Sequence, residues 1–415
     1  MATQAPKFRW PVVNPGPSWS CPRVAMPDIF SIQWDMPLDT WFYAGHALDT
    51  DGNEYSLNLY FARGYDPFDP SGQFSSLGIG VGVAATGDYH MCTANGPGAS
   101  EDPSSSAALI VPRATDSSYS LTFSGGDPAA TGTMAYSDGA AMGIQGAIYK
   151  ARAEGTSSTG VAMILELELN DALGTKMEGV SGWVGPTYEI AQPRLEITAG
   201  KVTLGDKVVQ LTGGSLWHDR QTYNMTEGAQ PPADAKAEPK PKPLYTGNWI
   251  IMLFDSGLSA DVNVVWPVVS EPGTQWQMGR SFDPPRPPVS GSGNLYFADG
   301  ADRYNGGAFL NGIGDTDETY DYDVNIFDPA DTQRSPHWRS PVTGNVYCNK
   351  WKVTFSSRLA GWNVPPVVYV AALVPGCEYA PPGGRAFWEG ATHLFSDPEC
   401  TQRIGTGFVE QMGYN

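Results

Sequence analysis

The sequence predicts an all-β protein, and three observations predict this class. Apolar residues recur at every second position in many short runs, which is the pattern of half-buried strands. Glycine (48 residues) and proline (35 residues) are plentiful in the 415-residue chain, as the turns between many short strands require. No segment keeps a helical apolar period over about 12 residues.

The chain begins with a proline-punctuated arm, residues 1–38, which is followed by a predicted β-domain over residues 39–226. Its most regular strand is Glu54–Phe61, where Tyr55, Leu57, Leu59 and Phe61 alternate with other residues. Glycine, aspartate, asparagine or serine clusters separate most strands. Further strands are expected at Leu77–Ala84, Tyr119–Phe123, Ile144–Ala151, Val161–Leu169, Leu195–Thr198 and Lys207–Leu211.

A second β-domain is predicted over residues 246–415, after a linker at residues 227–245. The linker segment Glu227–Pro243 consists mainly of proline, alanine and charged residues, which cannot bury a core, so we expect it to be mobile. Two domains also suit a chain of this length. The expected strands are Trp249–Phe254, Asp261–Trp266, Asn294–Phe297, Trp351–Ser356, Val367–Leu373, Ala386–Phe395 and Gly407–Tyr414.

The formal net charge of −19 argues against a nucleic-acid partner, because a phosphate backbone would be repelled. No run of about 18 apolar residues occurs, so no membrane span is expected. The N-terminus MATQAPKFRW has no apolar core of a secretory signal, which predicts a cytoplasmic protein. The oligomeric state stays open.

The five cysteines are odd in number and widely spaced, without a C-x-x-C pair. We expect reduced thiols, and a Cys377–Cys400 bridge is the alternative. The five histidines show no metal-ligand spacing, and no nucleophile elbow, P-loop or dinucleotide fingerprint occurs. The sequence therefore predicts no metal and no cofactor, and chemistry that depends on a shaped apolar site.

The densest polar cluster follows the turn at Gly213-Gly214 and reads Leu216–Gln221. On a strand, His218 and Arg220 face one side while Trp217 and Asp219 face the other. We predict catalytic roles for His218, Asp219 and Arg220, with Asp219 or His218 as proton donor or orienting group, and substrate contacts for Trp217 and Gln221. The alternative is an Asp219–Arg220 ion pair that ties the two domains together.

Two aromatic segments add candidate substrate-binding residues. In the first predicted strand Trp41 and Tyr43 share one face and His46 lies on the other, although such rings more often belong to a core. Near the C-terminus Trp388 and Glu389 adjoin, and Glu389 and Glu410 each have apolar neighbours that would raise the pKa of an unpaired carboxyl. Each glutamate is a conceivable general acid, and a buried ion pair or a cross-strand hydrogen bond is the simpler interpretation.

Three segments, in this order, resemble the two-domain lipocalin-like superfamily of carotenoid 1,2-hydratase, kievitone hydratase and the lipocalin-like Diels–Alderases. The first is Trp41–Leu48, which is similar to the aromatic opening strand of that family. The second is Gly214–Gln221 with Trp249, and the third is Phe387–Gly390 with Gly405–Tyr414. Together they span about 375 residues.

The resemblance implies two lipocalin-like β-sandwich or β-barrel domains packed side by side, an apolar small-molecule substrate, and neither metal nor cofactor. Members either hydrate a prenyl-type alkene or close a polyene by cycloaddition. The proline-rich insertion, Gln221 and the long N-terminal arm depart from the bacterial hydratase pattern. They favour a cofactor-independent pericyclase of secondary metabolism, acting on a terpenoid or polyketide intermediate. The alternatives are an acid-catalysed hydratase and a non-catalytic carrier.

We expect the site at the domain junction, because the 216–221 cluster ends the first domain and Trp249 opens the second. Trp41, Tyr43, Trp217, His218, Asp219, Arg220 and Trp249 should frame it.

The linker allows a first test. Replacing Glu227–Pro243 by a short Gly-Ser linker should leave the melting temperature nearly unchanged, because the segment has no large apolar side chain to pack. Thermal unfolding measures this. A drop of roughly ten degrees would show that the segment docks on the folded protein, since about 1 kcal/mol moves such a domain by only a few degrees.

Overall fold

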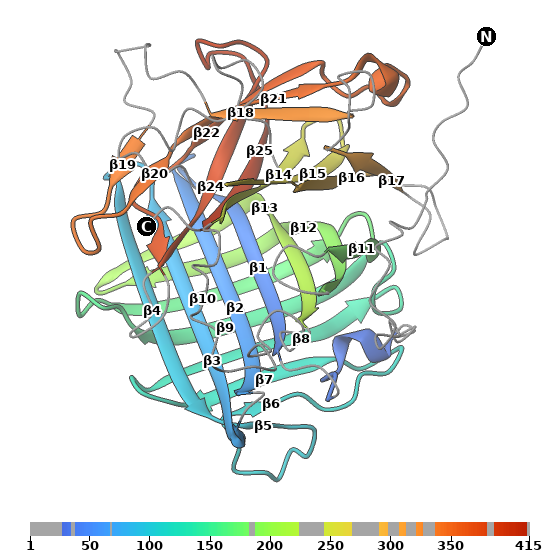
Figure 1. Ribbon diagram of the computed structural model, residues 1–415. Coiled ribbons are helices and arrows are strands. Elements are labelled where there is room, and N and C mark those ends of the chain that lie inside the picture. The colour runs from blue at the N-terminus through green and yellow to red at the C-terminus, as the bar shows by residue number, and fades with distance from the viewer. Residues whose placement is uncertain are drawn as a thin grey trace, which may run out of the picture.

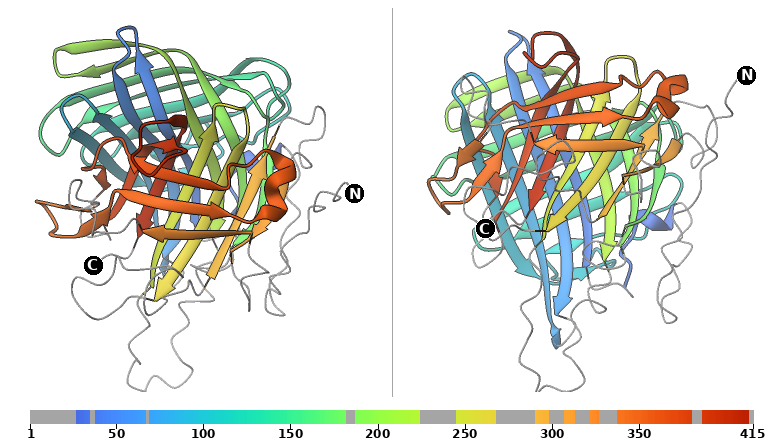
Figure 2. Two further views of the ribbon diagram at one scale, coloured as in Figure 1. Left: turned by 90° about the horizontal axis from the view of Figure 1, so that it is seen from above. Right: turned by 45° about the horizontal axis from the view of Figure 1, so that its top comes forward.

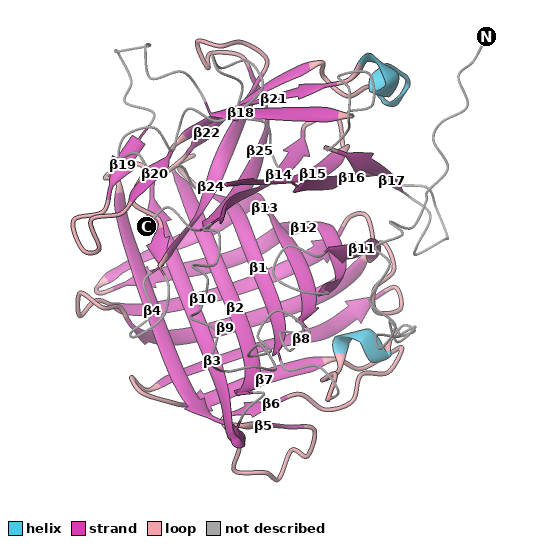
Figure 3. Cartoon of the chain, in the orientation of Figure 1, coloured by secondary structure: helices cyan, strands magenta, loops and turns pink. Residues whose placement is uncertain are grey.

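The predicted all-β class is confirmed. The computed structural model describes residues 27–34, 38–66, 69–181, 187–223, 245–267, 290–297, 307–312, 321–326, 337–379 and 386–412. In these residues the only helical elements are two short 3-10 turns, η1 (Asp28–Phe30) and η3 (Ser357–Trp362), drawn in cyan in Figure 3. The strands form a large nearly closed barrel and a smaller half-barrel, which lie side by side (Figure 1).

The first barrel is a 13-stranded sheet in the order β4-β3-β2-β1-β13-β12-β10-β9-β8-β7-β6-β5, with β11 paired to β12. Neighbouring strands are antiparallel except for β5 and β6. Its strands are β1 (Leu38–Asp49), β2 (Glu54–Asp66), β3 (Asp69–Val83), β4 (Asp88–Pro97), β5 (Ala99–Ser100), β6 (Leu109–Ile110), β7 (Ser120–Gly125), β8 (Ala130–Gly139), β9 (Ala147–Thr156), β10 (Ala162–Asp171), β11 (Lys176–Ser181), β12 (Thr187–Leu204) and β13 (Lys207–Tyr223).

The half-barrel is a 10-stranded sheet in the order β17-β16-β15-β14-β25-β24-β22-β21-β18, with β23 paired to β24, and β19 pairs with β20 beside it. The strands are β14 (Tyr245–Phe254), β15 (Ser259–Pro267), β16 (Ser290–Tyr296), β17 (Gly307–Asn311), β18 (Tyr322–Ile326), β19 (His337–Arg339), β20 (Val346–Cys348), β21 (Lys350–Phe355), β22 (Val367–Ala372), β23 (Glu378–Tyr379), β24 (Phe387–Phe395) and β25 (Arg403–Met412).

Side chains along β2 alternate between the two faces of the sheet, and this alternation determines which of them the barrel buries. Tyr55, Leu57, Leu59 and Phe61 point inward and are at most 1% exposed. The intervening residues face the half-barrel instead, and Asn58 is also 1% exposed. Because both faces of this strand are covered, a one-residue slip in register would exchange the two sets.

The two sheets meet along β1, β2 and β13 of the barrel and β14, β24 and β25 of the half-barrel. Figure 2 shows these strands stacked where the blue and red ribbons cross. A separate apolar cluster fills this junction, from Phe42 and Trp217 on one side to Trp249, Ile251 and Phe408 on the other. We call the space between these strands the sheet junction.

The remaining expectations drawn from the sequence have mixed outcomes, and several fall on undescribed residues. Cys377 and Cys400 are not joined by a disulfide, so the alternative of a bridge between them is wrong. No described helix has the length and apolar character that crossing a membrane requires. The arm up to residue 26 and the segment Glu227–Pro243 lie outside the described residues. The domain limits stay predictions.

A buried ion network supports the inner face of β1 and β13. Asp39 accepts hydrogen bonds from Arg220 and Arg63, and all three side chains are at most 4% exposed. The Arg220 guanidinium also lies 4.1 Å above the Trp41 ring, in a cation–π contact. One carboxylate therefore balances two guanidinium groups that are removed from water.

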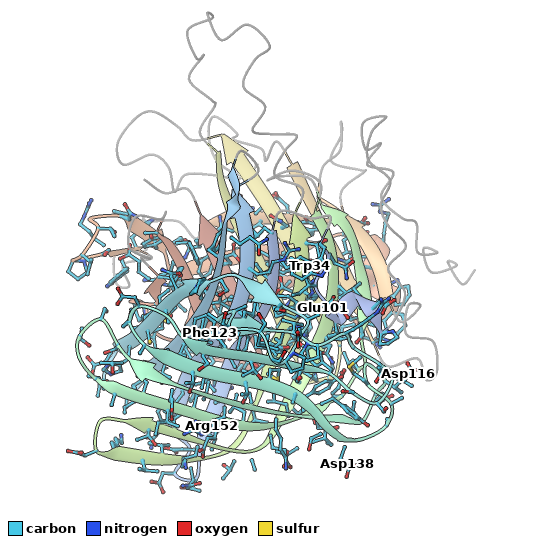
Figure 4. All side chains as sticks on the ribbon, turned by 90° about the horizontal axis from the view of Figure 1, so that it is seen from below. Trp34, Glu101, Asp116, Phe123, Asp138 and Arg152 are labelled. Carbon is cyan, nitrogen blue, oxygen red and sulfur yellow. The ribbon has the colours of Figure 1, made fainter. Side chains whose placement is uncertain are left out.

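Asp39→Asn tests this network. The variant should lower the free energy of unfolding by about 3–5 kcal/mol, because it leaves two buried arginines without their counter-charge. Urea denaturation measures the change. As a control, Glu154→Gln breaks the exposed pair with Arg152, labelled in Figure 4, and should cost less than about 1 kcal/mol. Equal effects of the two substitutions would contradict the interpretation.

Candidate functional site

Strand alternation divides the predicted site residues into two groups. β1 and β13 pair with Trp41 opposite Arg220, Phe42 opposite Asp219 and Tyr43 opposite His218. Directly opposed residues in an antiparallel pair point to the same face. The first and third pairs point into the barrel, and the second points into the sheet junction.

The inward group consists of Trp41, Tyr43, His218 and Arg220. The Tyr43 and His218 rings stack with centroids 4.0 Å apart and an interplanar angle of 5°. The Tyr43 hydroxyl also lies 3.0 Å from that of Tyr119, across the barrel interior. These four residues therefore belong to the core of the barrel.

His218 is held by a chain of hydrogen bonds that ends at Asp171. The Gln192 side-chain nitrogen donates to Asp171 Oδ2 at 2.6 Å, so Gln192 Oε1 is the acceptor that faces His218 Nδ1 at 2.6 Å. His218 Nδ1 must carry the proton, and Nε2 presents its lone pair. Burial lowers the pKa of His218 well below its ordinary value and raises the pKa of Asp171 to about 7. His218 is therefore neutral.

The outward group lies in the sheet junction. Trp217 packs edge-on against Trp249, with ring centroids 6.1 Å apart, and against Tyr296 at 5.5 Å. Asp219 lies two residues along the same face and accepts a hydrogen bond from the Gln221 side chain. The structure thus places Trp217, Asp219 and Gln221 on one face of β13, and Trp217 contacts Trp249 across the junction.

Trp388 and Glu389 are adjacent but face opposite sides of β24. Trp388 points into the half-barrel, where its ring nitrogen donates to the Pro375 carbonyl oxygen at 2.6 Å. Glu389 points into the junction and accepts a hydrogen bond from Asn58 of the barrel. Only Glu389 is therefore placed beside the outward group.

Glu389 lies directly opposite Glu410 on β25, and Glu410 is in turn opposite Trp249 on β14. Burial and then the charge of Glu410 raise the pKa of Glu389 well above its ordinary value. Burial raises the pKa of Glu410 to about 7. Two carboxyls this close cannot both ionise in a water-poor place, so the pair holds a proton near neutral pH. Glu389 does accept a hydrogen bond from another strand, as one of the simpler interpretations of the sequence expects, and the two glutamates also face each other.

A further buried carboxyl, Asp261 on β15, was missed by sequence reasoning. It accepts hydrogen bonds from Trp249 Nε1 at 3.3 Å, Asn294 Nδ2 at 3.0 Å and the Tyr296 hydroxyl at 2.9 Å. Burial raises its pKa to about 6, against the lowering effect of these donors. Asp261 thereby fixes two of the aromatic rings that surround the junction. The alternating strand Asp261–Trp266 was its only sequence signal.

Several buried polar atoms of the junction have no hydrogen-bond partner among the described residues. They are Asn58 Oδ1, Trp217 Nε1, Ser259 Oγ and Asn294 Oδ1. Each such atom costs roughly 1–3 kcal/mol if nothing satisfies it. Bound water or a ligand can supply the partners that these atoms need.

A surface depression lies elsewhere on the barrel, between the β7–β8 turn and the ends of β9 and β10. It has a volume of about 530 Å³, and Glu154 is its only ionisable lining residue. The other lining residues are small, apolar or threonine, so the depression offers no comparable chemistry.

No family model and no curated protein matches the sequence. Among solved structures, a protein assigned as AttH from Nitrosomonas europaea matches with a TM-score of 0.60 and 14% identity, over 96% of this chain and 98% of that chain. Kievitone hydratase from Nectria haematococca matches with a TM-score of 0.52 and 12% identity, over 94% of each chain. The resemblance read from the sequence is therefore confirmed for the lipocalin-like two-domain fold.

The raised pKa values of the carboxyl pair predict how the free energy of unfolding depends on pH. A raised pKa means that the folded state binds the proton more tightly, so its stabilisation is present below the ordinary value near 4.5 and is lost as pH rises through about 7. The free energy of unfolding should fall over this window by up to about 1.4 kcal/mol per pH unit for each such group.

Urea denaturation of wild type and Glu410→Gln between about pH 5 and pH 8 checks this, and the variant should show a flatter dependence. Glu168→Gln, which alters an exposed glutamate, should keep the wild-type slope. If Glu410→Gln also keeps that slope, Glu410 does not titrate as argued.

Proposed function

We propose that this chain is an enzyme that acts on an apolar small molecule in the sheet junction, with protonated carboxyl groups as proton donors. The observation that carries the proposal is the Glu389–Glu410 pair, in which a buried and a partly buried carboxyl lie opposite each other with raised pKa values among tryptophan and tyrosine rings. Strongly perturbed carboxyls in such surroundings are candidates for general acids.

The reaction that this arrangement supports best is acid-catalysed hydration of an alkene. The protonated carboxyl transfers its proton to one alkene carbon, and the other carbon becomes a carbocation. Faces of Trp217, Trp249 and Tyr296 can stabilise that positive charge. Water then adds to the cation and returns a proton to the carboxylate, so the product is the alcohol and the acid is regenerated.

The structural comparison supports hydration at the level of fold alone. A kievitone hydratase shares this two-domain arrangement, which shows that the fold accommodates the reaction. The residues named for this chain come from its own geometry. The inward group, Trp41, Tyr43, His218 and Arg220, would act by positioning β1 and β13, one face away from the substrate.

The sequence favours pericyclic closure of a polyene. We keep this reaction as the second candidate. A neutral carboxyl can donate a hydrogen bond to a carbonyl of the substrate and withdraw electrons from the reacting double bond. The aromatic side chains favour it, because holding a polyene in its reactive shape can supply about 7–11 kcal/mol. In this reaction the acid assists but transfers no proton.

The two reactions differ in product composition. Kievitone, after which the structural neighbour is named, serves as the alkene probe, and a linear triene that carries an unsaturated carbonyl group serves as the polyene probe. A product that gains one water, with its oxygen drawn from labelled solvent, shows hydration. A product isomeric with the probe shows cyclisation, and binding without turnover shows a carrier.

Variants identify the groups that act. Glu389→Gln should lower the hydration rate by at least about a hundredfold while the protein stays folded, because the proton donor is lost. Trp249→Ala should lower it through misplacement of the substrate. Mass spectrometry of the products measures both, and the exposed Glu168→Gln is the control.

The remaining outcomes separate the mechanisms. Asp219→Asn should retain a measurable rate if the glutamate pair is the acid, and a dead Asp219→Asn with intact substrate binding would transfer that role to Asp219. Cyclisation that survives every carboxyl substitution but not Trp249→Ala would establish the pericyclase instead.

A further inference from the structure

A second polar cluster lies at one end of the sheet junction, where two hairpins meet. His46 near the end of β1 and Glu54 at the start of β2 come from the barrel, and His393 on β24 and Arg403 on β25 come from the half-barrel. His46 Nε2 lies 3.1 Å and His393 Nε2 lies 3.0 Å from Glu54 Oε1. The proposed reaction does not use this cluster.

Three nitrogens converge on one oxygen of Glu54. Besides the two imidazoles, Arg403 Nη1 lies 2.6 Å from the same Oε1. A carboxylate oxygen has two lone pairs, so it accepts two well-directed hydrogen bonds. The cluster therefore brings together more nitrogen atoms than hydrogen bonding to this oxygen can use.

The geometry suits a small divalent cation. Ligands of a tetrahedral zinc at about 2.0–2.1 Å lie roughly 3.3 Å apart, close to the two nitrogen–oxygen distances in the cluster. The three ligand atoms all lie within 4.8 Å of one another. Imidazole nitrogens and a carboxylate oxygen are common zinc ligands.

The backbone holds one of the ligands rigidly in place. Gly214 on β13 has φ +117°, and a Cβ atom there would come within 2.2 Å of the His46 carbonyl oxygen. This glycine lets β13 approach β1 directly beside His46, which is only 2% exposed. His393 then meets it edge-on across the junction, with ring centroids 5.7 Å apart.

We propose that His46, Glu54 and His393 form a zinc-binding site that joins the two sheets. Three protein ligands leave a fourth position for water. Arg403 is the competitor, because its positive charge opposes a cation at Glu54. Its side chain is 36% exposed, so it can turn toward solvent when zinc binds. Zinc should therefore stabilise the association of barrel and half-barrel.

Calorimetric titration of the chelator-treated full chain with zinc chloride tests the proposal. Wild type should bind one zinc ion per chain and melt at a higher temperature with zinc. His393→Ala should weaken zinc binding by more than about tenfold. It is the first variant to examine, because His393 is more exposed than His46 and more readily replaced. His90→Ala, a half-buried histidine on β4 outside the cluster, should bind zinc as wild type does.

Arg403→Met distinguishes a metal site from a simple ionic contact. If zinc and Arg403 compete for Glu54, this variant should bind zinc more tightly than wild type and gain more in melting temperature from it. If the cluster is only an ionic contact, the variant should melt at a lower temperature and respond to zinc no more than His393→Ala. That second result would overturn the proposal, as would equal zinc binding by wild type and His393→Ala.

Discussion

The pairing of β1 with β13 is the constraint on which the rest of the structure depends. Where Trp41–Ala44 pairs with Trp217–Arg220, both strands are covered on both faces, so each side chain there belongs either to the barrel core or to the sheet junction. A shift of one residue would place Trp41 and Arg220 among the apolar rings of the junction and Phe42 among the ion pairs of the barrel. The close approach at Gly214 and the Asp39–Arg220 contact both oppose such a shift.

Asp39 on the barrel face and Glu389 on the junction face are both buried carboxyls, but their neighbours differ. Asp39 lies beside two guanidinium groups, so its burial is compensated by charge. Glu389 and Glu410 face each other, and neither forms a salt bridge within the described part of the chain. Burial without a cation keeps a proton on such a pair, which is the property that a general acid requires. The proposed function therefore rests on the carboxyls of the junction.

The sequence predicts correctly which side chains of a strand share a face. It predicts only some of the residues that these side chains contact. The alternation in Trp41–His46 and in Leu216–Gln221 separates inward from outward side chains, as the structure also does. The sequence nevertheless expects Trp41, Tyr43, His218 and Arg220 beside Trp249, whereas the structure places them on the opposite face of the strands. The two-residue period of a strand predicts which residues share a face, but it does not predict which face binds a ligand. The buried Asp171–Gln192–His218 chain shows that polar residues on a strand also serve a core.

The features that can be predicted from the sequence are local. They are the all-β class, most strand positions and the side to which each residue of a strand points, because these follow from a two-residue period and from turn chemistry. Which residues meet depends on tertiary packing. Asn58 reaches Glu389 from 331 positions away, and Glu54 meets His393 across 339. Such contacts depend on how two curved sheets pack, which no spacing along the chain encodes. The histidine cluster therefore forms only where β1 and β2 pack against β24 and β25, whereas the register of β24 against β25 places the two glutamates opposite each other.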